Sequence, residues 1–233
     1  EVYESLEHEV PKTSMPSPGE VFELFNRLKS EGFTHVISIH ISSGLSGTYA
    51  MVQQVASEIK GMTIEVIDSK ALSMGLGFPV LEAVKGIRDN QGFQEVLERV
   101  NSVIRKLKVF FVLGTLDYLR QGGRIGYVSG TLGEILQLKP IISINEEGKY
   151  FTFTKVRGRK QSLSKMFEVF QEQIKGKVAN VAVMHGAAFE EARDLMDKIK
   201  ELTNVKQLFS NQIGPVMVVH TGPGLVGFAL YEE

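Results

Sequence analysis

Hydroxyl side chains crowd one short stretch of the sequence, residues 42–49, which holds Ser42, Ser43, Ser46 and Thr48 around Gly47. The stretch follows an apolar run and opens a helical pattern. Free backbone N–H groups and the positive end of the helix dipole at such a junction suit an anion. The stretch therefore predicts an anion site, with a plain capped turn as the alternative, since Ser46 alone would cap the helix.

A second hydroxyl cluster precedes the first helical pattern. Ser17, with Pro18 and Glu20 after it, is typical of a helix cap with a capping box. Thr13 and Ser14 lie just upstream of that cap. They could face the same crevice as residues 42–49, a point that the sequence alone leaves open.

His220 ends an apolar run that we interpret as a strand, 216–220, and Thr221 follows it, just before a Gly-Pro-Gly turn. Ligands of open α/β sheets gather at strand ends, so His220 is a candidate for proton or anion chemistry. A structural histidine is the alternative. His185, at the end of a predicted strand, is a weaker candidate.

Other ionisable residues give fewer signals. Arg157 lies in a compact basic patch, residues 155–160, which suits a phosphate, an acidic partner or a solvated face. The remaining histidines have no companion at ligand spacing and cysteine is absent, so we expect no metal site, disulfide or thiol nucleophile.

The overall composition is that of a globular protein of one large or two small domains, with 233 residues, 43% of them hydrophobic. The formal net charge of −1 argues against nucleic acid as the main partner. No apolar stretch approaches the ~20 residues that span a bilayer, so no stable membrane insertion is expected. A cytoplasmic location fits the absence of cysteine.

Helical and strand patterns alternate along the chain, which predicts an α/β protein. The first half favours parallel strands, whereas the pattern around 145–148 predicts an antiparallel hairpin. We place a domain boundary near 110, giving domains 1–110 and 111–233. The predicted strands are 36–41, 64–67, 109–113, 141–144, 150–154, 178–184, 216–220 and 225–230, and the predicted helices are 17–31, 46–60, 80–90, 93–107, 160–175 and 188–201.

Six segments, taken in order, resemble the DegV family of bacterial fatty-acid-binding proteins, which includes the FakB subunits of fatty acid kinase. Any one of these segments would be a weak signal, but six in order are strong. They are KTSMPS at 12–17, SSGLSGTY at 42–49, VIDS at 66–69, LDYLRQGGRI at 116–125, KPI at 139–141 and HTGPG at 220–224.

The resemblance implies two α/β domains, the first with a mostly parallel sheet and the second with a mixed sheet, and one acyl chain such as palmitate between them. It implies that hydroxyls of the two serine- and threonine-rich motifs hold the carboxylate, with His220 close by. It further implies a carrier that is not catalytic alone and has no other cofactor. A separate ATP-binding kinase subunit would phosphorylate the carboxylate for phospholipid synthesis, and Arg157 matches the arginine linked to that partner.

Two departures from the family pattern bear on these expectations. Met15 stands where the family usually has glutamine, which affects the carboxylate end of the site. The family's opening strand, with its Asp-Ser-Thr motif, does not occur upstream of Glu1.

Two rival functions remain open at this point. A self-sufficient phosphotransferase would use His220 as its nucleophile, although the sequence has no Walker A loop and no kinase signature. A regulatory or structural protein would use the hydroxyl clusters only as helix caps.

Overall fold

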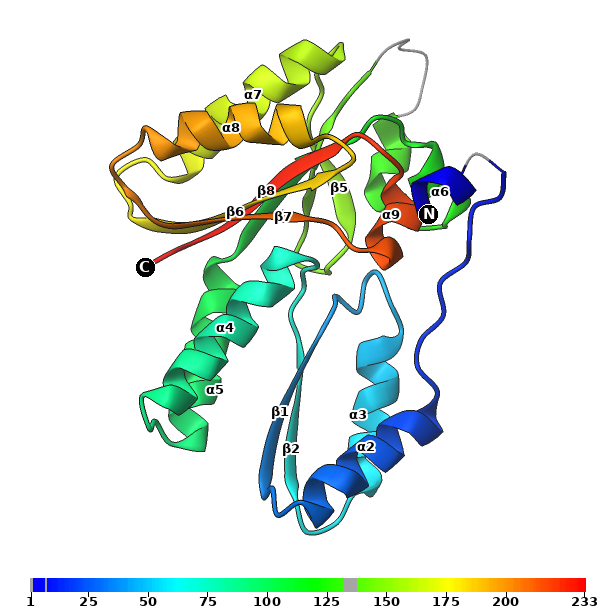
Figure 1. The fold of residues 1–233 in the computed structure, drawn as a ribbon, viewed down its shortest axis with the longest axis vertical. Helices are drawn as coiled ribbons and strands as arrows, with labels where there is room; N and C mark the ends of the chain where they lie inside the picture. Colours follow the sequence, from blue (N-terminus) through cyan, green and yellow to red (C-terminus); the bar gives the residue numbers. More distant parts are fainter. Residues whose placement is uncertain (1, 7, 132–137) are drawn as a thin grey trace. The chain divides into compact units, whose positions relative to one another are not determined.

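The computed structural model describes residues 2–6, 8–131 and 138–233 (Figure 1). By its internal contacts the chain forms two compact units. The smaller unit comprises residues 14–105 and 146–148, and the larger unit comprises 1–13, 106–145 and 149–233. The units thus interleave along the sequence, whereas the sequence analysis expected two continuous ranges divided at 110.

The smaller unit has a two-stranded parallel sheet with helices on both faces (Figure 1). Alternation of side chains along the strands sends Val36 and Ile64 to one face and Ile37 and Ile67 to the other. The elements are α2 (Pro18–Ser30), β1 (His35–His40), α3 (Thr48–Glu58), β2 (Thr63–Asp68), α4 (Met74–Arg88) and α5 (Phe93–Lys106). Helices α2 and α3 cover the first face, and α4 and α5 cover the second.

Local sequence explains how this unit begins. Ser17 accepts the backbone N–H of Glu20, and the Glu20 carboxylate accepts the N–H of Ser17, so the predicted capping box is confirmed. Helix α3 starts later than predicted, at Thr48, with Gly47 as its N-cap instead of Ser46. Strands β1 and β2 pair residue for residue from His35 with Thr63 to His40 with Asp68, which brings their carboxyl ends together.

The larger unit has a mixed six-stranded sheet in the order β5-β4-β3-β8-β6-β7. Only β6 and β7 pair in parallel, and every other pairing is antiparallel. Its elements are α1 (Val2–Ser5), β3 (Lys108–Val112), α6 (Asp117–Gln121), the 3-10 helix η1 (Gly126–Thr131), β4 (Ile141–Ile144), β5 (Tyr150–Thr154), α7 (Arg159–Gln173), β6 (Ala179–Gly186), α8 (Phe189–Lys200), β7 (Val205–Gln212), α9 (Pro215–Thr221) and β8 (Leu225–Glu232).

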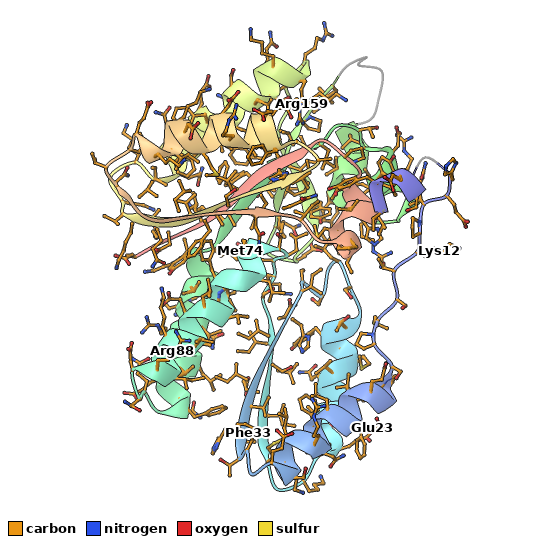
Figure 2. The ribbon with its side chains drawn as sticks, viewed as in Figure 1. Lys12, Glu23, Phe33, Met74, Arg88 and Arg159 are labelled. Carbon is orange, nitrogen blue, oxygen red and sulfur yellow. The ribbon has the colours of Figure 1, made fainter. Side chains whose placement is uncertain are left out.

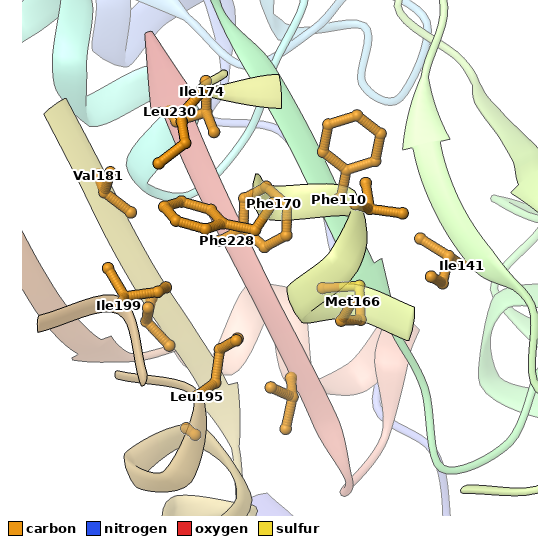
Figure 3. Close-up of a cluster of buried hydrophobic side chains, with 14 of the residues drawn as sticks. Phe110, Ile141, Met166, Phe170, Ile174, Val181, Leu195, Ile199, Phe228 and Leu230 are labelled. Carbon is orange, nitrogen blue, oxygen red and sulfur yellow. The ribbon is translucent and has the colours of Figure 1, made fainter. Parts of the chain in front are cut away.

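The main core of the larger unit lies where α7 and α8 cover one face of this sheet (Figures 1 and 3). Phe170 of α7 meets Phe228 of β8 edge to face, with ring centroids 5.2 Å apart. Leu195 and Ile199 of α8 pack into the same cluster. Burial of these large side chains supplies the driving force that fixes the two helices on the sheet.

The structure confirms the predicted α/β class, with a parallel first sheet, a mixed second sheet and the predicted hairpin of β4 and β5. Two strand predictions were wrong. The third strand, β3, pairs antiparallel in the larger sheet instead of extending the parallel one. Residues 216–220 form helix α9, because Pro215 is a favourable first helical residue and the four apolar residues after it fit a helix as well as a strand.

Candidate functional site

Thr13 and His220 form a hydrogen-bonded pair in the larger unit. Thr13 Oγ1 lies 2.8 Å from His220 Nε2, although the two residues are 207 positions apart. His220 stands at the end of α9, not at a strand end, and its other nitrogen, Nδ1, is buried with no partner among the described residues. The edge of the imidazole that carries Nδ1 packs onto Gly122, where any side chain would overlap the ring.

The surroundings of His220 favour an uncharged ring. Burial lowers the pKa of His220 below its ordinary value, and the positive charge of Arg124 lowers it further. A neutral imidazole has one N–H, and a buried N–H without an acceptor is rarer in proteins than an unpaired acceptor. These conditions favour the proton on Nε2, which then donates to Thr13 and leaves the Thr13 hydroxyl hydrogen available to an anion.

Thr221 has a different role from its neighbour. Its side chain is fully buried, and its hydroxyl donates to the Met217 carbonyl at 2.9 Å within α9. Gly222 ends this helix with φ of +65° and ψ of −174°. Thr221 therefore stabilises the helix that holds His220, and it offers no free hydroxyl to a ligand.

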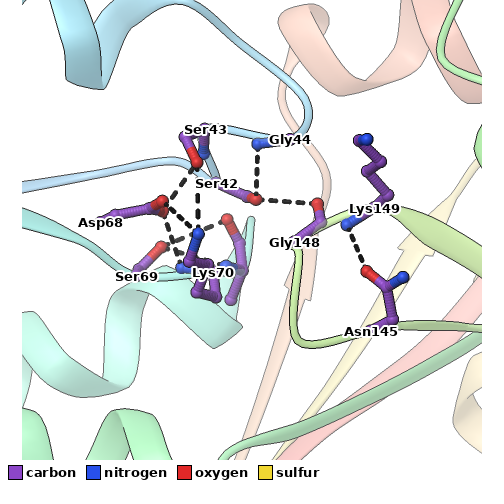
Figure 4. Close-up of polar contacts among 10 residues, drawn as sticks. Ser42, Ser43, Gly44, Asp68, Ser69, Lys70, Asn145, Gly148 and Lys149 are labelled. Atoms are coloured by element: carbon purple, nitrogen blue, oxygen red, sulfur yellow. Dashed lines mark hydrogen bonds and ion pairs between the residues drawn. The ribbon is translucent and has the colours of Figure 1, made fainter.

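Ser42, in the loop just after β1, is also internal to the fold of its unit. Its hydroxyl donates to the Gly148 carbonyl at 2.7 Å and accepts the Gly44 N–H at 3.1 Å (Figure 4). The residue is 0% exposed. Ser42 therefore fixes the loop that carries the neighbouring Ser43.

Ser43 is exposed and belongs to a charged network that the sequence analysis missed. Its backbone N–H donates to Asp68 at 3.1 Å, and the Lys70 ammonium lies 2.9 Å from Asp68 and 3.3 Å from the Ser43 hydroxyl (Figure 4). Burial alone raises the pKa of Asp68, but hydrogen bonds from Ser43 and Lys70 outweigh it and hold that pKa below its ordinary value. The predicted anion site thus already holds a carboxylate, that of Asp68.

A signal for this network was present in the sequence. Asp68 directly ends the second predicted strand, and Ser43 follows the first. Neighbouring parallel strands end at the same edge of a sheet, so residues just beyond them approach one another. Applying that rule to residues 42–43 and 68–70 would have brought Asp68 and Lys70 into the site.

The remaining predicted hydroxyls lie at the start of α3 and just before α2. Ser46 accepts the backbone N–H of Thr48 at 3.3 Å, and the two hydroxyls lie 2.9 Å apart. A side chain at Gly47 would crowd the Met15 sulfur at 2.8 Å, so the thioether rests on the helix start. Ser14 is exposed and has no side-chain hydrogen bond within the described residues.

The basic patch at residues 155–160 divides into two parts. Arg159 is the first residue of α7 (labelled in Figure 2). It forms a double hydrogen bond with Glu191. Lys155, Arg157 and Lys160 are exposed, and Arg157 makes no ion pair with other described residues. Arg157 therefore presents its charge to solvent.

The weaker histidine candidate, His185, is a core residue of β6. It is 8% exposed and packs edge-on against Phe189 at the start of α8. Across the described ranges, no cluster of three or more His, Cys, Asp or Glu residues could hold a metal ion. Among the same residues, no helix is both long enough and apolar enough to cross a membrane.

Comparison with known proteins gives a consistent family match. The model of the DegV family, described as an uncharacterised protein family, matches residues 1–233. A DegV domain-containing protein of Clostridium acetobutylicum is 44% identical over 234 residues, covering 100% of this chain and 83% of that protein.

Solved structures give the same match. A fatty acid binding DegV family protein from Streptococcus agalactiae superposes with a TM-score of 0.92 at 31% identity, covering 100% of this chain and 83% of the other. A stearic acid-binding protein from Eubacterium ventriosum superposes with a TM-score of 0.89 at 27% identity, with coverage of 99% and 82%. Similarity at this level extends along the whole chain.

Proposed function

Because this chain belongs to the DegV family, we propose that it binds a long-chain fatty acid and presents the carboxylate to a separate ATP-dependent kinase subunit. The fatty-acid-binding relatives support the ligand class. The observation that carries the proposal is the Thr13–His220 pair, in which a neutral imidazole turns a hydroxyl donor toward an anion. Acyl-phosphate formation in the cytoplasm would then supply phospholipid synthesis.

The energetics of such a ligand require a paired head group. At ~0.8 kcal/mol for each buried methylene, a chain of about fourteen methylenes has an upper-limit transfer gain of ~11 kcal/mol. Association costs approach the same size. An ionised carboxylate buried without partners would cancel much of the gain, so hydroxyl and ammonium donors at the head group decide whether binding is favourable.

Chemical identification of the bound molecule tests the proposal. The purified protein is extracted with organic solvent, and the extract is analysed by mass spectrometry. We expect about one fatty acid per chain. Bound nucleotide would favour the phosphotransferase instead, and an extract without either would favour a structural role.

Half-buried Thr13 and exposed Ser43 should both contribute to binding, Thr13 by donating its hydroxyl hydrogen and Ser43 through the charged network with Asp68 and Lys70 to which its hydroxyl belongs. We expect Ser43→Ala and Thr13→Ala each to weaken fatty-acid binding by roughly 0.5–3 kcal/mol, the range for a hydrogen bond to a charged group. Calorimetric titration with palmitate measures the loss.

Ser42→Ala is the matched control for these variants. Because the Ser42 hydroxyl is buried and holds the Gly148 carbonyl and the Gly44 N–H, its removal should lower the free energy of unfolding by about 1–3 kcal/mol. Ser43→Ala removes a hydroxyl that is exposed to water, so it should lower the free energy of unfolding by less than Ser42→Ala does. If Ser43→Ala and Thr13→Ala bind palmitate like the parent, the carboxylate assignment is wrong.

Arg157 should matter to the kinase subunit rather than to the ligand. It is exposed, and Lys155 and Lys160 beside it extend a positive field that suits an acidic partner surface. We expect Arg157→Ala to lower kinase turnover several-fold at low salt, with a difference that shrinks as salt screens the field. Steady-state kinetics at several salt concentrations, with fatty-acid affinity measured in parallel, check this.

Arg193→Ala is the control for that experiment. Arg193 is an exposed arginine of α8 in the same unit, paired with Glu190 and outside the basic patch. Arg193→Ala should leave kinase turnover unchanged. Should Arg157→Ala reduce fatty-acid affinity as much as it reduces turnover, Arg157 would belong to the ligand site instead.

The rival phosphotransferase requires a free nitrogen on His220. In the structure Nε2 is hydrogen-bonded to Thr13, and Nδ1 faces Gly122. Phosphorylation at either nitrogen would therefore have to break a contact that the fold makes. This geometry favours a residue that orients Thr13 over one that carries a phosphoryl group.

A further inference from the structure

The loop after β2 holds Lys70 in an unusual backbone conformation. Lys70 has φ of +52°, and Ser73, three residues later, has φ of +50°. Residues other than glycine adopt this left-handed region at a cost, which persists when the surrounding contacts fix it. Here the turn lets the Lys70 backbone N–H and side-chain ammonium both reach Asp68, at 3.0 and 2.9 Å.

Most donor hydrogens of this network already have an acceptor. The Ser43 hydroxyl donates to Asp68 and accepts from the Lys70 ammonium. An ammonium has three N–H donors, and Asp68 and Ser43 use two of them. The Lys70 side chain is 43% exposed and makes no other hydrogen bond within the described part of the chain. One charged donor therefore remains free beside Ser43.

We propose that Lys70 selects the carboxylate of the ligand, binding it through this third N–H next to Ser43. This inference rests on the proposed function, which it makes more specific. A hydroxyl group can hydrogen-bond either an alcohol or a carboxylate, whereas the Lys70 ammonium makes an ion pair with the carboxylate that an uncharged alcohol cannot make. Asp68 is the positioning residue, because it holds the ammonium beside Ser43.

The distinguishing measurement is the ratio of affinities for palmitate and hexadecanol, two ligands with the same tail length. Both are supplied from cyclodextrin and compete with a fluorescent fatty acid. Lys70→Met keeps the aliphatic stem and removes the charge. We expect Lys70→Met to weaken palmitate binding roughly 10-fold to 100-fold, the range of a hydrogen bond to a charged group. The affinity for hexadecanol should stay unchanged. Lys70→Arg should keep most of the preference.

Lys85→Met is the matched control. Lys85 lies in the same unit, is 41% exposed and is also ion-paired, with Glu82. Lys85→Met should leave the ratio of the affinities for palmitate and hexadecanol unchanged. Should Lys70→Met fail to fold, the double variant Asp68→Asn with Lys70→Met removes the charges as a pair, and we expect the same lost preference.

Each outcome separates this inference from the proposed function. If the parent binds palmitate and Lys70→Met still prefers palmitate to hexadecanol as strongly as the parent does, the role of Lys70 is overturned and fatty-acid binding remains supported. An equal loss for palmitate and hexadecanol also overturns it, since it indicates a structural effect. A parent that binds neither ligand overturns both.

Discussion

His220→Ala is expected to retain much of the fatty-acid affinity and to lose most acyl-phosphate formation in the presence of the kinase subunit. Tail burial dominates binding, so one missing head-group neighbour changes affinity little. Without the imidazole, the Thr13 hydroxyl has no partner to direct its proton toward the reacting carboxylate. A loss of roughly 10²-fold in turnover is the scale for removing one preorganised donor. Transfer of a labelled phosphoryl group from ATP to the fatty acid measures this turnover.

Two further variants isolate this role of His220. His220→Gln places an amide N–H near the position of Nε2 and should restore part of the turnover. His185→Ala removes another histidine with a buried, unpartnered Nδ1 in the same unit, and turnover of the folded protein should stay normal. Label that appears on the isolated chain with ATP, and disappears in His220→Ala, would overturn the carrier proposal in favour of a phosphotransferase.

Gly222→Ala should destabilise the protein more than Ser42→Ala does. The φ of +65° and ψ of −174° at Gly222 belong to a region that is essentially restricted to glycine, with a cost of about 1–3 kcal/mol for other residues. The added methyl group would also overlap the ring of Tyr118. We expect a total loss of at least about 3 kcal/mol in the free energy of unfolding, measured by urea denaturation.

Gly176→Ala provides the comparison for Gly222→Ala. Gly176 also has a positive φ, +71°, but nothing lies within 4 Å of an added methyl group. It should cost only about 1 kcal/mol, the lower end of the range for left-handed backbone. Equal losses in the two variants would mean that the Tyr118 contact has no part in the stability of the turn.

Local signals in the sequence predicted much of the fold. The capping box at Ser17 and the hairpin of β4 and β5 depend on residues close together in the chain, and both are confirmed. Strand β7 was missed because its sequence, VKQLFSNQ, is largely polar and lies at the edge of the sheet. The run at 216–219 was misassigned because four apolar residues fit either period, and only burial in the folded unit decides between them.

The candidate site was less predictable because its contacts are distant in sequence. The sequence links Thr13 to His220 only through the resemblance to a family, since no local pattern joins residues 207 positions apart. Ser43 and Asp68 meet through the parallel register of two strands. Ser42 and Thr221 show the converse limit, because residue type alone cannot tell an exposed hydroxyl from one that the fold has buried.

The place of β8 in its sheet bears on how the protein is made. This strand, the last of the six in chain order, lies between β3 and β6 and pairs Leu230 with Lys108, residues 122 positions apart. A ribosome must therefore synthesise residues 225–232 before the two halves of the sheet can join. Until then β3 and β6 expose unpaired edges in the nascent chain, where strand edges invite aggregation. Because this closure joins strands that are distant in sequence, it is also expected to be a slow step of folding.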